Sequence, residues 1–402
     1  MSNVPQNPAQ PRQQQFNQQP SYPQQPQQTP PVQWQTSQQP QRQAPQPPVY
    51  APPVVQQQAP LASRPTAPQQ HVPKPGGVTA EETQRAKSII ATIAKAYSAK
   101  VVGQESLRTT LLIALMTGGH VLLESVPGLA KTTAAQTIAD TIHADFKRIQ
   151  CTPDLLPSDI IGTQVYDNRT GEFSTRLGPV HANFVLLDEI NRSSAKTQSA
   201  MLEAMQERQT TIGGEVHRLP HPFLVIATQN PIEQEGTYQL PEAQLDRFLL
   251  KDVVPYSTPV EEREILRRVD SGVLDAGAHI NASVTLEDIL FLQNVTKRIY
   301  VSDPIADYIV AVVTRSRTPK ESIPQYGSLI TYGASPRASI GFMQASRALA
   351  LLSGKDAVYP DDVKELRHVI LRHRIGLSYE AEIKGITVED VIDALFNSVT
   401  AP

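Results

Sequence analysis

One stretch, residues 120–133, constrains the fold of this chain more than any other part of its sequence. A short apolar run at 121–123 predicts a buried strand, and a compact Pro-Gly turn follows it. Lys131-Thr132 then leads into a helix-like run of small and apolar residues. This order of strand, loop, Lys-Thr and helix is typical of a loop that holds a polyphosphate. The stretch therefore predicts an α/β fold built around such a loop.

Each polar residue of this loop has an expected role. Backbone N–H groups and the positive end of the helix would face a polyphosphate, Lys131 would contact its β and γ phosphates, and the Thr132 hydroxyl would hold Mg²⁺. The usual pattern is G-x-x-x-x-G-K-[ST], but Ser125 and Ala130 stand at the two glycine positions, and only Gly128 remains inside the loop. On this pattern alone, a plain helix start after a core strand is the alternative.

Residues 1–77 have a composition that predicts disorder. They contain 19 of the 35 prolines of the chain and 23 glutamines, with no aspartate or glutamate. Such a stretch buries too little apolar surface to offset the loss of chain entropy on folding. We expect a solvated tether, and a docking role for its scattered aromatic residues is the alternative.

Charge and cysteine content disfavour several classes of protein. The whole chain has a net charge of −3 and the tail is basic, so the remaining part is mildly acidic. This argues against a protein that works mainly on duplex nucleic acid, although a local basic patch is compatible with it. The single cysteine, Cys151, excludes an internal disulfide and a cysteine-based metal cluster, and a semi-buried thiol at a strand end is expected. The sequence shows neither a signal peptide nor a membrane span, so we expect a soluble cytoplasmic protein.

Strand-like and helix-like stretches alternate after the tail. The strand-like runs are 146–151, 184–187, 223–228 and 248–254, and helices are expected at 79–97, 107–116 and 194–208. This alternation predicts a mainly parallel sheet covered by helices on both faces. Two candidate hairpins, 163–175 and 209–219, interrupt it, and such insertions usually face a partner.

From about residue 257 the strand signals stop. Apolar stripes at helical spacing predict helices at 285–299, 303–317, 335–353, 360–373 and 387–398. The sequence thus predicts a disordered tail at 1–77, an α/β domain at 78–256 and a smaller all-helical domain at 257–402.

Two adjacent carboxylates, Asp188 and Glu189, follow the apolar run 184–187. At the carboxyl edge of a parallel sheet they would lie beside the phosphate loop. Hydrolysis of a phosphate needs a carboxylate near Mg²⁺, expected of Asp188, and a group that activates water, expected of Glu189. Asn230, which follows the run 223–228, is a candidate to orient the same water. Taken singly, the Asp-Glu pair is equally well interpreted as a solvated strand end, and Asn230 is also explained as part of an Asn-Pro turn. Together, the phosphate loop and the carboxylates predict a nucleotide-hydrolysing site.

Seven phrases that occur in one order resemble the AAA+ ATPases and, within them, the MoxR family. They are Val-Pro-Gly-Leu-Ala-Lys-Thr, Thr-Pro-Asp-Leu-Leu-Pro-Ser-Asp, Asp-Glu-Ile-Asn-Arg, Lys-Thr-Gln-Ser-Ala-Met-Leu-Glu-Ala-Met, Ala-Thr-Gln-Asn-Pro, Leu-Pro-Glu-Ala-Gln-Leu-Asp-Arg-Phe and Ala-Ser-Pro-Arg-Ala. The resemblance covers nearly all of residues 78–400 and excludes the tail. The family normally has alanine where Ala130 stands, whereas Ser125 occupies a position that is usually glycine.

The resemblance implies ATP and Mg²⁺ as ligands. Lys131 and Thr132 would form the Walker A pair, Asp188 and Glu189 the Walker B pair, and Asn230 sensor 1, with Mg²⁺ held by Thr132 and Asp188. Further loop contacts would come from Ser125, Val126, Pro127, Gly128, Leu129, Ala130 and Thr133, and contacts to the base from Val102, Gly103 and Gln104.

Two arginines complete the catalytic set that the resemblance implies. Arg247 resembles the arginine finger, which reaches the γ-phosphate of a neighbouring subunit, and Arg337 resembles sensor 2 on the helical lid. From the residues alone, each is also compatible with an ordinary surface arginine. A finger that acts in trans implies a homo-oligomeric ring of about six subunits, as in the superfamily, whose site is incomplete in one chain.

The family implies an ATPase that remodels or matures a partner protein, for example one with a von Willebrand A-type domain, or a metalloenzyme complex. A DNA-dependent motor of the same clade is the alternative, which the acidic charge and the lack of an appended DNA-binding motif disfavour. A scaffold that binds ATP and barely hydrolyses it is a third reading, motivated by Ser125. The presence of Glu189 and Arg247 argues against that reading.

Overall fold

The computed structural model describes residues 77–126, 128–231, 236–272 and 284–402, and the structural statements below concern these residues. All of them belong to one compact unit, residues 71–402. The predicted tail lies outside the described residues, except for Gly77. Among the described helices, none is both long enough and apolar enough to cross a lipid bilayer.

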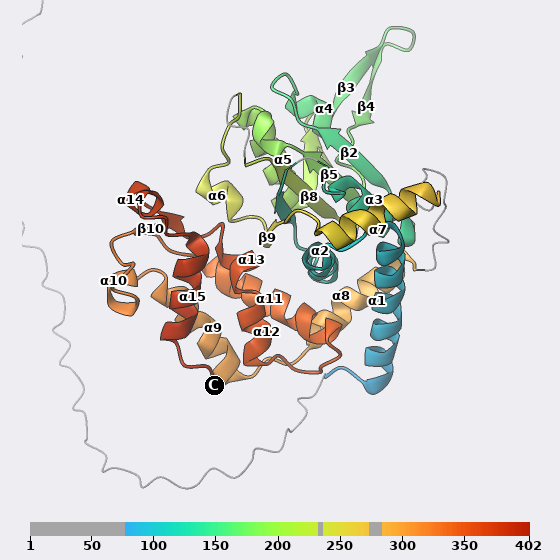
Figure 1. The fold of residues 1–402 in the computed structure, drawn as a ribbon. Coiled ribbons are helices and arrows are strands. Elements are labelled where there is room, and N and C mark those ends of the chain that lie inside the picture. The colour runs from blue at the N-terminus through green and yellow to red at the C-terminus, as the bar shows by residue number, and fades with distance from the viewer. Residues whose placement is uncertain (1–76, 127, 232–235, 273–283) are drawn as a thin grey trace, which may run out of the picture. The chain divides into compact units, whose positions relative to one another are not determined.

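A five-stranded parallel sheet forms the centre of the first half of the described chain (Figure 1). Its strands are β1 (Val121–Glu124), β2 (Phe146–Gln150), β5 (Phe184–Asp188), β8 (Leu224–Gln229) and β9 (Leu250–Val253). Their order across the sheet is β2, β5, β8, β1, β9, and every neighbouring pair is parallel. The predicted parallel sheet is confirmed, and the carboxyl ends of all five strands meet at one edge.

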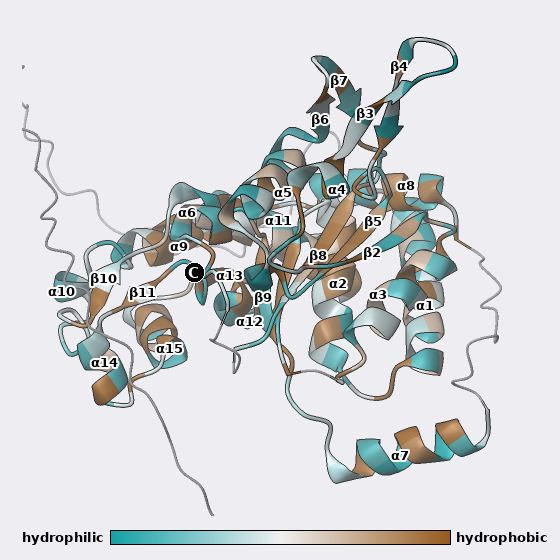
Figure 2. Cartoon of the chain, turned by 90° about the horizontal axis from the view of Figure 1, so that it is seen from above, coloured by the Kyte–Doolittle hydropathy of each residue, from teal (hydrophilic) through white to brown (hydrophobic). Residues whose placement is uncertain are grey.

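The central strands separate two apolar cores, one on each face of the sheet. Leu122 and Val185 pack into one core, whereas Val121 and Leu186, their neighbours in sequence, pack into the other. The covering helices are α1 (Ala80–Lys100), α2 (Glu105–Thr117) and α3 (Lys131–Thr141) on one face and α5 (Ala195–Glu207) on the other. Figure 2 shows the apolar strands in brown between these helices. Burial on both faces explains why the central strands β1, β5 and β8 begin as unbroken apolar runs in the sequence, whereas the edge strand β2 contains exposed polar residues.

Both predicted hairpins are present and lie next to each other. The first pairs β3 (Gly162–Asp167) with β4 (Glu172–Leu177), and the second pairs β6 (Gln209–Ile212) with β7 (Glu215–Arg218). They touch, because a Cβ placed at Gly213 would lie 2.1 Å from the amide carbon of Gln164. Figure 2 shows both hairpins extending away from the sheet on the side of α5.

Helices make up most of the described chain after residue 257. They are α7 (Pro259–Asp270), α8 (Leu286–Arg298), α9 (Asp303–Arg315), α10 (Pro319–Ser322), α11 (Pro336–Leu352), α12 (Pro360–Glu365), α13 (Arg367–Leu371), α14 (Tyr379–Ile383) and α15 (Val388–Ser398). The helix predicted at 360–373 is divided into α12 and α13. A short antiparallel pair, β10 (Ile330–Tyr332) with β11 (Gly376–Leu377), adds to the expected helices. Strands of three and two residues are too short to show a period of two in the sequence.

Three short helical segments connect elements of the sheet domain. They are α4 (Pro157–Ile161), the 3₁₀ helix η1 (Ile190–Arg192) and α6 (Glu242–Leu245). The segment α4 leads into the first hairpin, η1 follows the predicted carboxylates, and α6 precedes Arg247. Each segment is therefore next to a feature that the sequence singled out: the first hairpin, the two carboxylates or Arg247.

His120, the residue before β1, is buried and joins three elements. Its Nδ1 accepts a hydrogen bond from the backbone N–H of Val225 in β8 (3.0 Å), and its Nε2 lies 3.2 Å from the carbonyl oxygen of Met205 in α5. An acceptor at Nδ1 and a donor at Nε2 require a neutral ring. Burial, and to a smaller degree the nearby Arg208, lower the pKa of His120 to about 3. The ring thus holds the start of β1 against β8 and α5 only while it is uncharged.

We predict that His120 makes the stability of the fold depend on pH. The unfolded chain protonates this histidine below its ordinary pKa of about 6.5, whereas the folded chain keeps it neutral down to pH about 3. The folded state therefore loses stability as the pH falls from about 6.5 towards 3. When the pH is lowered from 7 to 5, His120 should decrease the free energy of unfolding of the unmodified chain by about 2 kcal/mol. His120→Gln should lack this part of the decrease. Urea unfolding at both pH values measures this difference, and an equal loss in the two proteins would contradict it.

Candidate functional site

A cavity of about 380 Å³ lies at the carboxyl edge of the sheet, beyond the ends of β1, β5 and β8. It is lined by Ser125, Gly128, Leu129, Ala130, Lys131, Thr132, Thr133, Arg148, Gln150, Asp188, Glu189, Thr228, Gln229 and Asn230. The structure thus brings together most of the predicted phosphate loop, both predicted carboxylates and Asn230. The lining residues come from parallel strands, from the loops that follow them and from the start of α3, as a site at the end of such a sheet requires.

The loop between β1 and α3 turns sharply and delivers the start of a helix to the cavity. Gly128 and Ala130 have φ angles of 86° and 55°, in the left-handed region, and α3 begins at Lys131. The first N–H groups of a helix have no partner within it and are suited to bind an anion. The Lys131 Nζ donates to the carbonyl oxygens of Ser125 (3.3 Å) and Val126 (3.1 Å). Burial lowers the pKa of Lys131, and the charges of the two nearby carboxylates oppose that shift.

One described residue of the predicted loop is not among those that line the cavity. Val126 contributes its carbonyl oxygen to the Lys131 contact but is absent from the lining. Pro127 lies outside the described residues. The loop assignment therefore rests on the other members of the stretch.

Ser125 fits the place where the family usually has glycine. Its φ angle is not in the left-handed region, so a side chain at this position causes no backbone strain. The side chain is buried, and its Oγ donates to the carbonyl oxygen of Val126 (3.2 Å). The Ser125 N–H donates to the carbonyl oxygen of Gln229 in β8 (3.2 Å), which continues the pairing of the two strands. The serine is therefore accommodated within the loop.

Thr228 of β8 organises the two carboxylates. Its Oγ1 donates to Asp188 Oδ1 (2.9 Å) and accepts from the Glu189 N–H (2.9 Å). The backbone of Glu189 has a φ of 56°, an uncommon conformation for a residue other than glycine. This turn lets Asp188 end the strand and Glu189 line the same cavity. Asn230, two residues after Thr228, is buried and lines the cavity as well.

Two residues of β2, which the sequence did not single out, also contact these carboxylates. Arg148 Nε donates to Asp188 Oδ2 (2.8 Å), and Gln150 Nε2 donates to Glu189 Oε2 (3.1 Å). They are two positions apart on one strand and so point to the same face. A polar pair at this spacing, on the strand before the one that ends in Asp-Glu, is the signal that could have identified them.

Cys151 follows β2 directly and is buried. Its N–H donates to the carbonyl oxygen of Asp188 (2.9 Å), which continues the pairing of β2 with β5. Burial raises the pKa of its thiol to about 12, so the thiol is protonated at neutral pH. The predicted thiol at a strand end is thus found, and it is more deeply buried than expected.

The residues expected to contact the base, Val102, Gly103 and Gln104, lie between α1 and α2 and do not line the cavity. Gly103 has a φ of 66°, and a Cβ there would lie 2.1 Å from Glu261 Oε1 at the start of α7. Gln104 Nε2 donates to the carbonyl oxygen of Pro255 (3.1 Å). In this structure the segment therefore packs against the chain that connects β9 to α7.

The two predicted arginines lie in a second cavity of about 350 Å³. Arg247 and Arg337 line it together with Arg208, Asp246 and Arg374, among others. Among the described residues, this cavity and the one around Lys131 have no lining residue in common. The predicted catalytic residues thus fall into two separate groups within one chain, with Glu189 and Asn230 in one cavity and Arg247 and Arg337 in the other.

Comparison with known proteins identifies the family of this chain. Residues 120–250 match the ATPase family associated with various cellular activities (AAA), and residues 327–395 match the AAA lid domain. The chain is 49% identical over 303 residues to Chaperone MoxR1 of Mycobacterium tuberculosis, a match that covers 75% of this chain and 79% of that protein. The chain belongs to the MoxR family of AAA+ ATPases.

Two further proteins are similar to most of this chain. A Bacillus subtilis protein named YeaC is 44% identical over 306 residues, which cover 75% of this chain and 91% of that protein. A crystal structure of a candidate ATPase from Cytophaga hutchinsonii is 44% identical, with a TM-score of 0.75, and the match covers 80% of this chain and 97% of that one. Fold and family thus agree with the resemblance found in the sequence.

We predict that Ser125→Gly changes ATP affinity by less than about threefold, because Ser125 needs no left-handed backbone and its hydroxyl donates to the carbonyl oxygen of Val126 within the same loop. A matched comparison is Gly128→Ala, where the backbone has a φ of 86° and a Cβ would meet no atom within 4 Å. Backbone strain of about 1 kcal/mol there should weaken ATP binding by roughly fivefold. Titration of a fluorescent ATP analogue measures both affinities, and a large gain in affinity for Ser125→Gly would contradict the prediction.

Proposed function

We propose that this MoxR-family protein hydrolyses ATP to ADP and phosphate with Mg²⁺ and uses the energy to remodel or mature partner proteins. The observation that carries the proposal is the cavity that Lys131, Thr132, Asp188, Glu189 and Asn230 line together. A cation, a hydroxyl, two carboxylates and an amide around one cavity are the groups that hydrolysis of a phosphoanhydride needs.

The lining residues fit a Mg²⁺ ion bound together with ATP. Mg²⁺ is usually held by one or two protein oxygens plus substrate phosphates and water. The Asp188 carboxylate and the Thr132 hydroxyl would supply those protein oxygens, and both line the cavity. When bound, Mg²⁺ neutralises charge on the phosphate oxygens.

Each remaining residue has a role within this proposal. Lys131 would exchange the loop carbonyls that it now contacts for the β and γ phosphates. Glu189 would orient and deprotonate the attacking water, and the Asn230 amide would help to orient it. Arg148, now paired with Asp188, would move toward the phosphates once the metal occupies that carboxylate.

The two arginines support a site shared between subunits. Arg247 and Arg337 line a cavity separate from the one around Lys131. In our proposal Arg247 contacts the γ-phosphate bound by a neighbouring subunit, and Arg337 helps from the same side. Hydrolysis would then require a homo-oligomeric ring, for which a hexamer is the superfamily's example.

The proposed contact with a client involves the two hairpins. Apolar side chains are exposed on them, including Tyr166 (52%) and Phe173 (68%), whose rings are 5.1 Å apart. An exposed apolar surface of this kind is suited to bind a protein. A relative named as a chaperone points the same way, and a client with a von Willebrand A-type domain is within the proposal.

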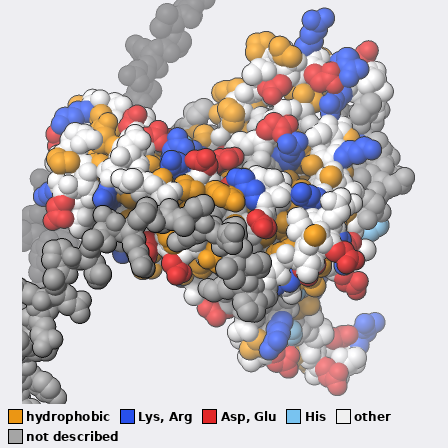
Figure 3. All heavy atoms as spheres, turned by 90° about the horizontal axis from the view of Figure 1, so that it is seen from below, with side chains coloured by type: hydrophobic (Ala, Val, Ile, Leu, Met, Phe, Trp, Pro, Cys, Tyr) orange, Lys and Arg blue, Asp and Glu red, His pale blue; other side chains and the backbone are white. Residues whose placement is uncertain are grey.

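A DNA-dependent motor is less well supported. On the face that Figure 3 shows, basic and acidic side chains are interspersed among apolar ones. A surface that binds duplex DNA is expected to concentrate basic residues. Addition of DNA to an ATPase assay separates the two functions, because a motor would be stimulated and a protein-remodelling ATPase would not.

We predict that Glu189→Gln binds ATP about as tightly as the unmodified protein but hydrolyses it at least about 100-fold more slowly, because the amide cannot take a proton from water. The matched variant Lys131→Ala should lose ATP binding itself. Equilibrium binding and phosphate release measure the two effects separately. Normal turnover by Glu189→Gln would place the base elsewhere, and unchanged binding by Lys131→Ala would remove the phosphate assignment.

We further predict that Arg247→Ala and Lys131→Ala chains, each inactive alone, regain part of the activity when mixed. In mixed rings the Lys131→Ala chain still offers its Arg247 to an intact nucleotide site on its neighbour. Phosphate release measured across mixing ratios tests this, with each variant alone as the control. Absence of activity at every ratio would indicate a site contained within one chain.

A further inference from the structure

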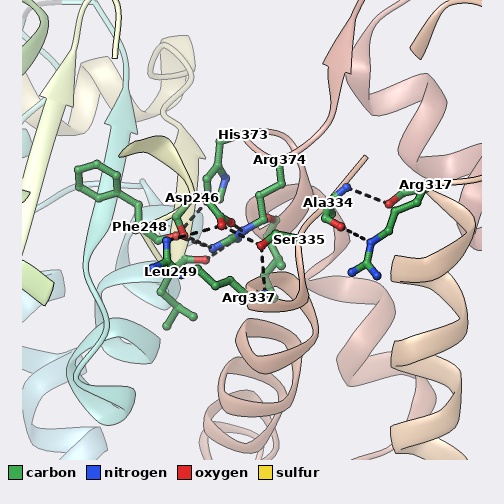
Figure 4. A network of polar contacts seen from close by, with 11 residues as sticks. Asp246, Phe248, Leu249, Arg317, Ala334, Ser335, Arg337, His373 and Arg374 are labelled. Carbon is green, nitrogen blue, oxygen red and sulfur yellow. Dashed lines mark hydrogen bonds and ion pairs between the residues drawn. The ribbon is translucent and has the colours of Figure 1, made fainter. Parts of the chain in front are cut away.

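The segment that carries Arg247 is held by a buried arginine from the helical part of the chain. Arg374 follows α13 and is only 4% exposed. Figure 4 shows its guanidinium group lying against Asp246, Phe248 and Leu249, the residues on either side of Arg247. Arg374 is distant in sequence from these residues, and no sequence pattern pointed to it.

The hydrogen bonds of Arg374 are directed almost entirely at this segment. Its Nε donates to Asp246 Oδ1 (2.8 Å), and its Nη2 donates to the carbonyl oxygens of Asp246 (3.3 Å) and Phe248 (2.6 Å). Its Nη1 donates to the carbonyl oxygens of Leu249 (3.2 Å) and Ile370 (2.5 Å). One guanidinium group therefore fixes the backbone on both sides of a single residue.

Asp246 extends this contact to the start of α11. Its second carboxylate oxygen accepts a hydrogen bond from Ser335 Oγ (2.8 Å) and lies 3.7 Å from Arg337 Nη1. Ser335 is the N-cap of α11, so the same carboxylate touches two elements of the helical part. A shift of α11 or of the segment after α13 would therefore displace Asp246, the residue before Arg247.

The side chain of Arg247 is half-buried and lines the second cavity. Its Nε is buried and makes no hydrogen bond within the part of the chain that the structure describes. An arginine whose flanking backbone is clamped, and whose side chain faces a cavity, is oriented before any ligand arrives. Preorganisation of this kind is what a charged group acting on a phosphate requires.

We propose that Arg374 and Asp246 are positioning residues that orient Arg247 toward the nucleotide of the neighbouring subunit and couple that orientation to the helical lid. This inference rests on the proposed function, in which Arg247 acts in trans. Arg374→Lys tests it, because lysine keeps the charge but lacks the planar fork that reaches several acceptors at once.

The experiment places Arg374→Lys in one chain of a mixed ring at a time. The donor chain is Lys131→Ala, which binds no ATP and only offers Arg247; the recipient chain is Arg247→Ala, which binds ATP and lacks the finger. In the donor, Arg374→Lys should reduce the restored phosphate release by at least about tenfold, because the finger is misplaced. In the recipient, it should change that release by less than about twofold, because no finger is there to be positioned.

The comparison of the two placements separates positioning from folding. A merely structural role for Arg374 predicts equal losses in donor and recipient, and equal losses or no loss in either would overturn the inference. If Arg374→Lys does not assemble, as size-exclusion chromatography would show, Asp246→Asn provides the same comparison with a smaller change in shape. A loss of at least about threefold confined to the donor supports the inference, and a symmetric loss overturns it.

The proposed function can fail separately. If Lys131→Ala and Arg247→Ala chains restore no activity in the first place, the shared site is wrong and the positioning role falls with it. If activity is restored but is insensitive to Arg374 and Asp246 in the donor, the shared site stands and only the positioning role is wrong.

Discussion

The cavity around Lys131 depends on the parallel hydrogen bonding of β1, β8 and β5. The register pairs Leu123 with Thr228 and Leu187 with Ala227, so the three strands end at one level. The phosphate loop, the two carboxylates and Asn230 follow directly from those ends. A slip of one residue would turn each strand over and exchange its two buried faces, which the separate cores on either side of the sheet do not permit. The packing of the cores therefore determines the geometry of the site.

Several charged side chains of the cavity around Lys131 already have polar partners within the chain, and a bound phosphate would have to replace some of these contacts. Arg148 pairs with Asp188, Arg192 lies 2.9 Å from Glu189, and Lys131 contacts carbonyls of its own loop. These contacts give each of the three cations an acceptor, which lowers the free-energy cost of placing charge in a partly buried site. In the proposed function, a bound polyanion and its metal would replace these contacts, so Arg148 and Lys131 would change partners.

Under the proposed function, the helical part acts on Arg247 through one small contact region. Asp246 receives Arg374 from the end of α13 and Ser335 from the start of α11, and it precedes Arg247 in sequence. The groups proposed to serve a neighbour are thus attached to the part of the chain that follows the sheet. A change in the angle between the two parts would move Arg247, and under the proposed function this movement would reach the ATP bound by the neighbouring subunit.

Local patterns made much of this protein predictable from its sequence. The apolar runs indicated the strands, the Gly-containing turns indicated both hairpins, and the Lys-Thr and Asp-Glu motifs indicated the cavity, because each signal lies within a few neighbouring residues. Arg148, Gln150, Thr228 and Arg374 were not predicted, because their roles depend on partners from other strands or helices. The separation of Arg337 from the phosphate loop was also beyond the sequence, whereas the separation of Arg247 was implied by its resemblance to a finger that acts in trans.

By itself the sequence determined the fold class, the family and the chemical character of the site, since these follow from short-range periodicity and from motifs of adjacent residues. Only the tertiary structure decided which side chains meet across the sheet and which residues hold Arg247, because contacts between distant segments depend on strand register and core packing.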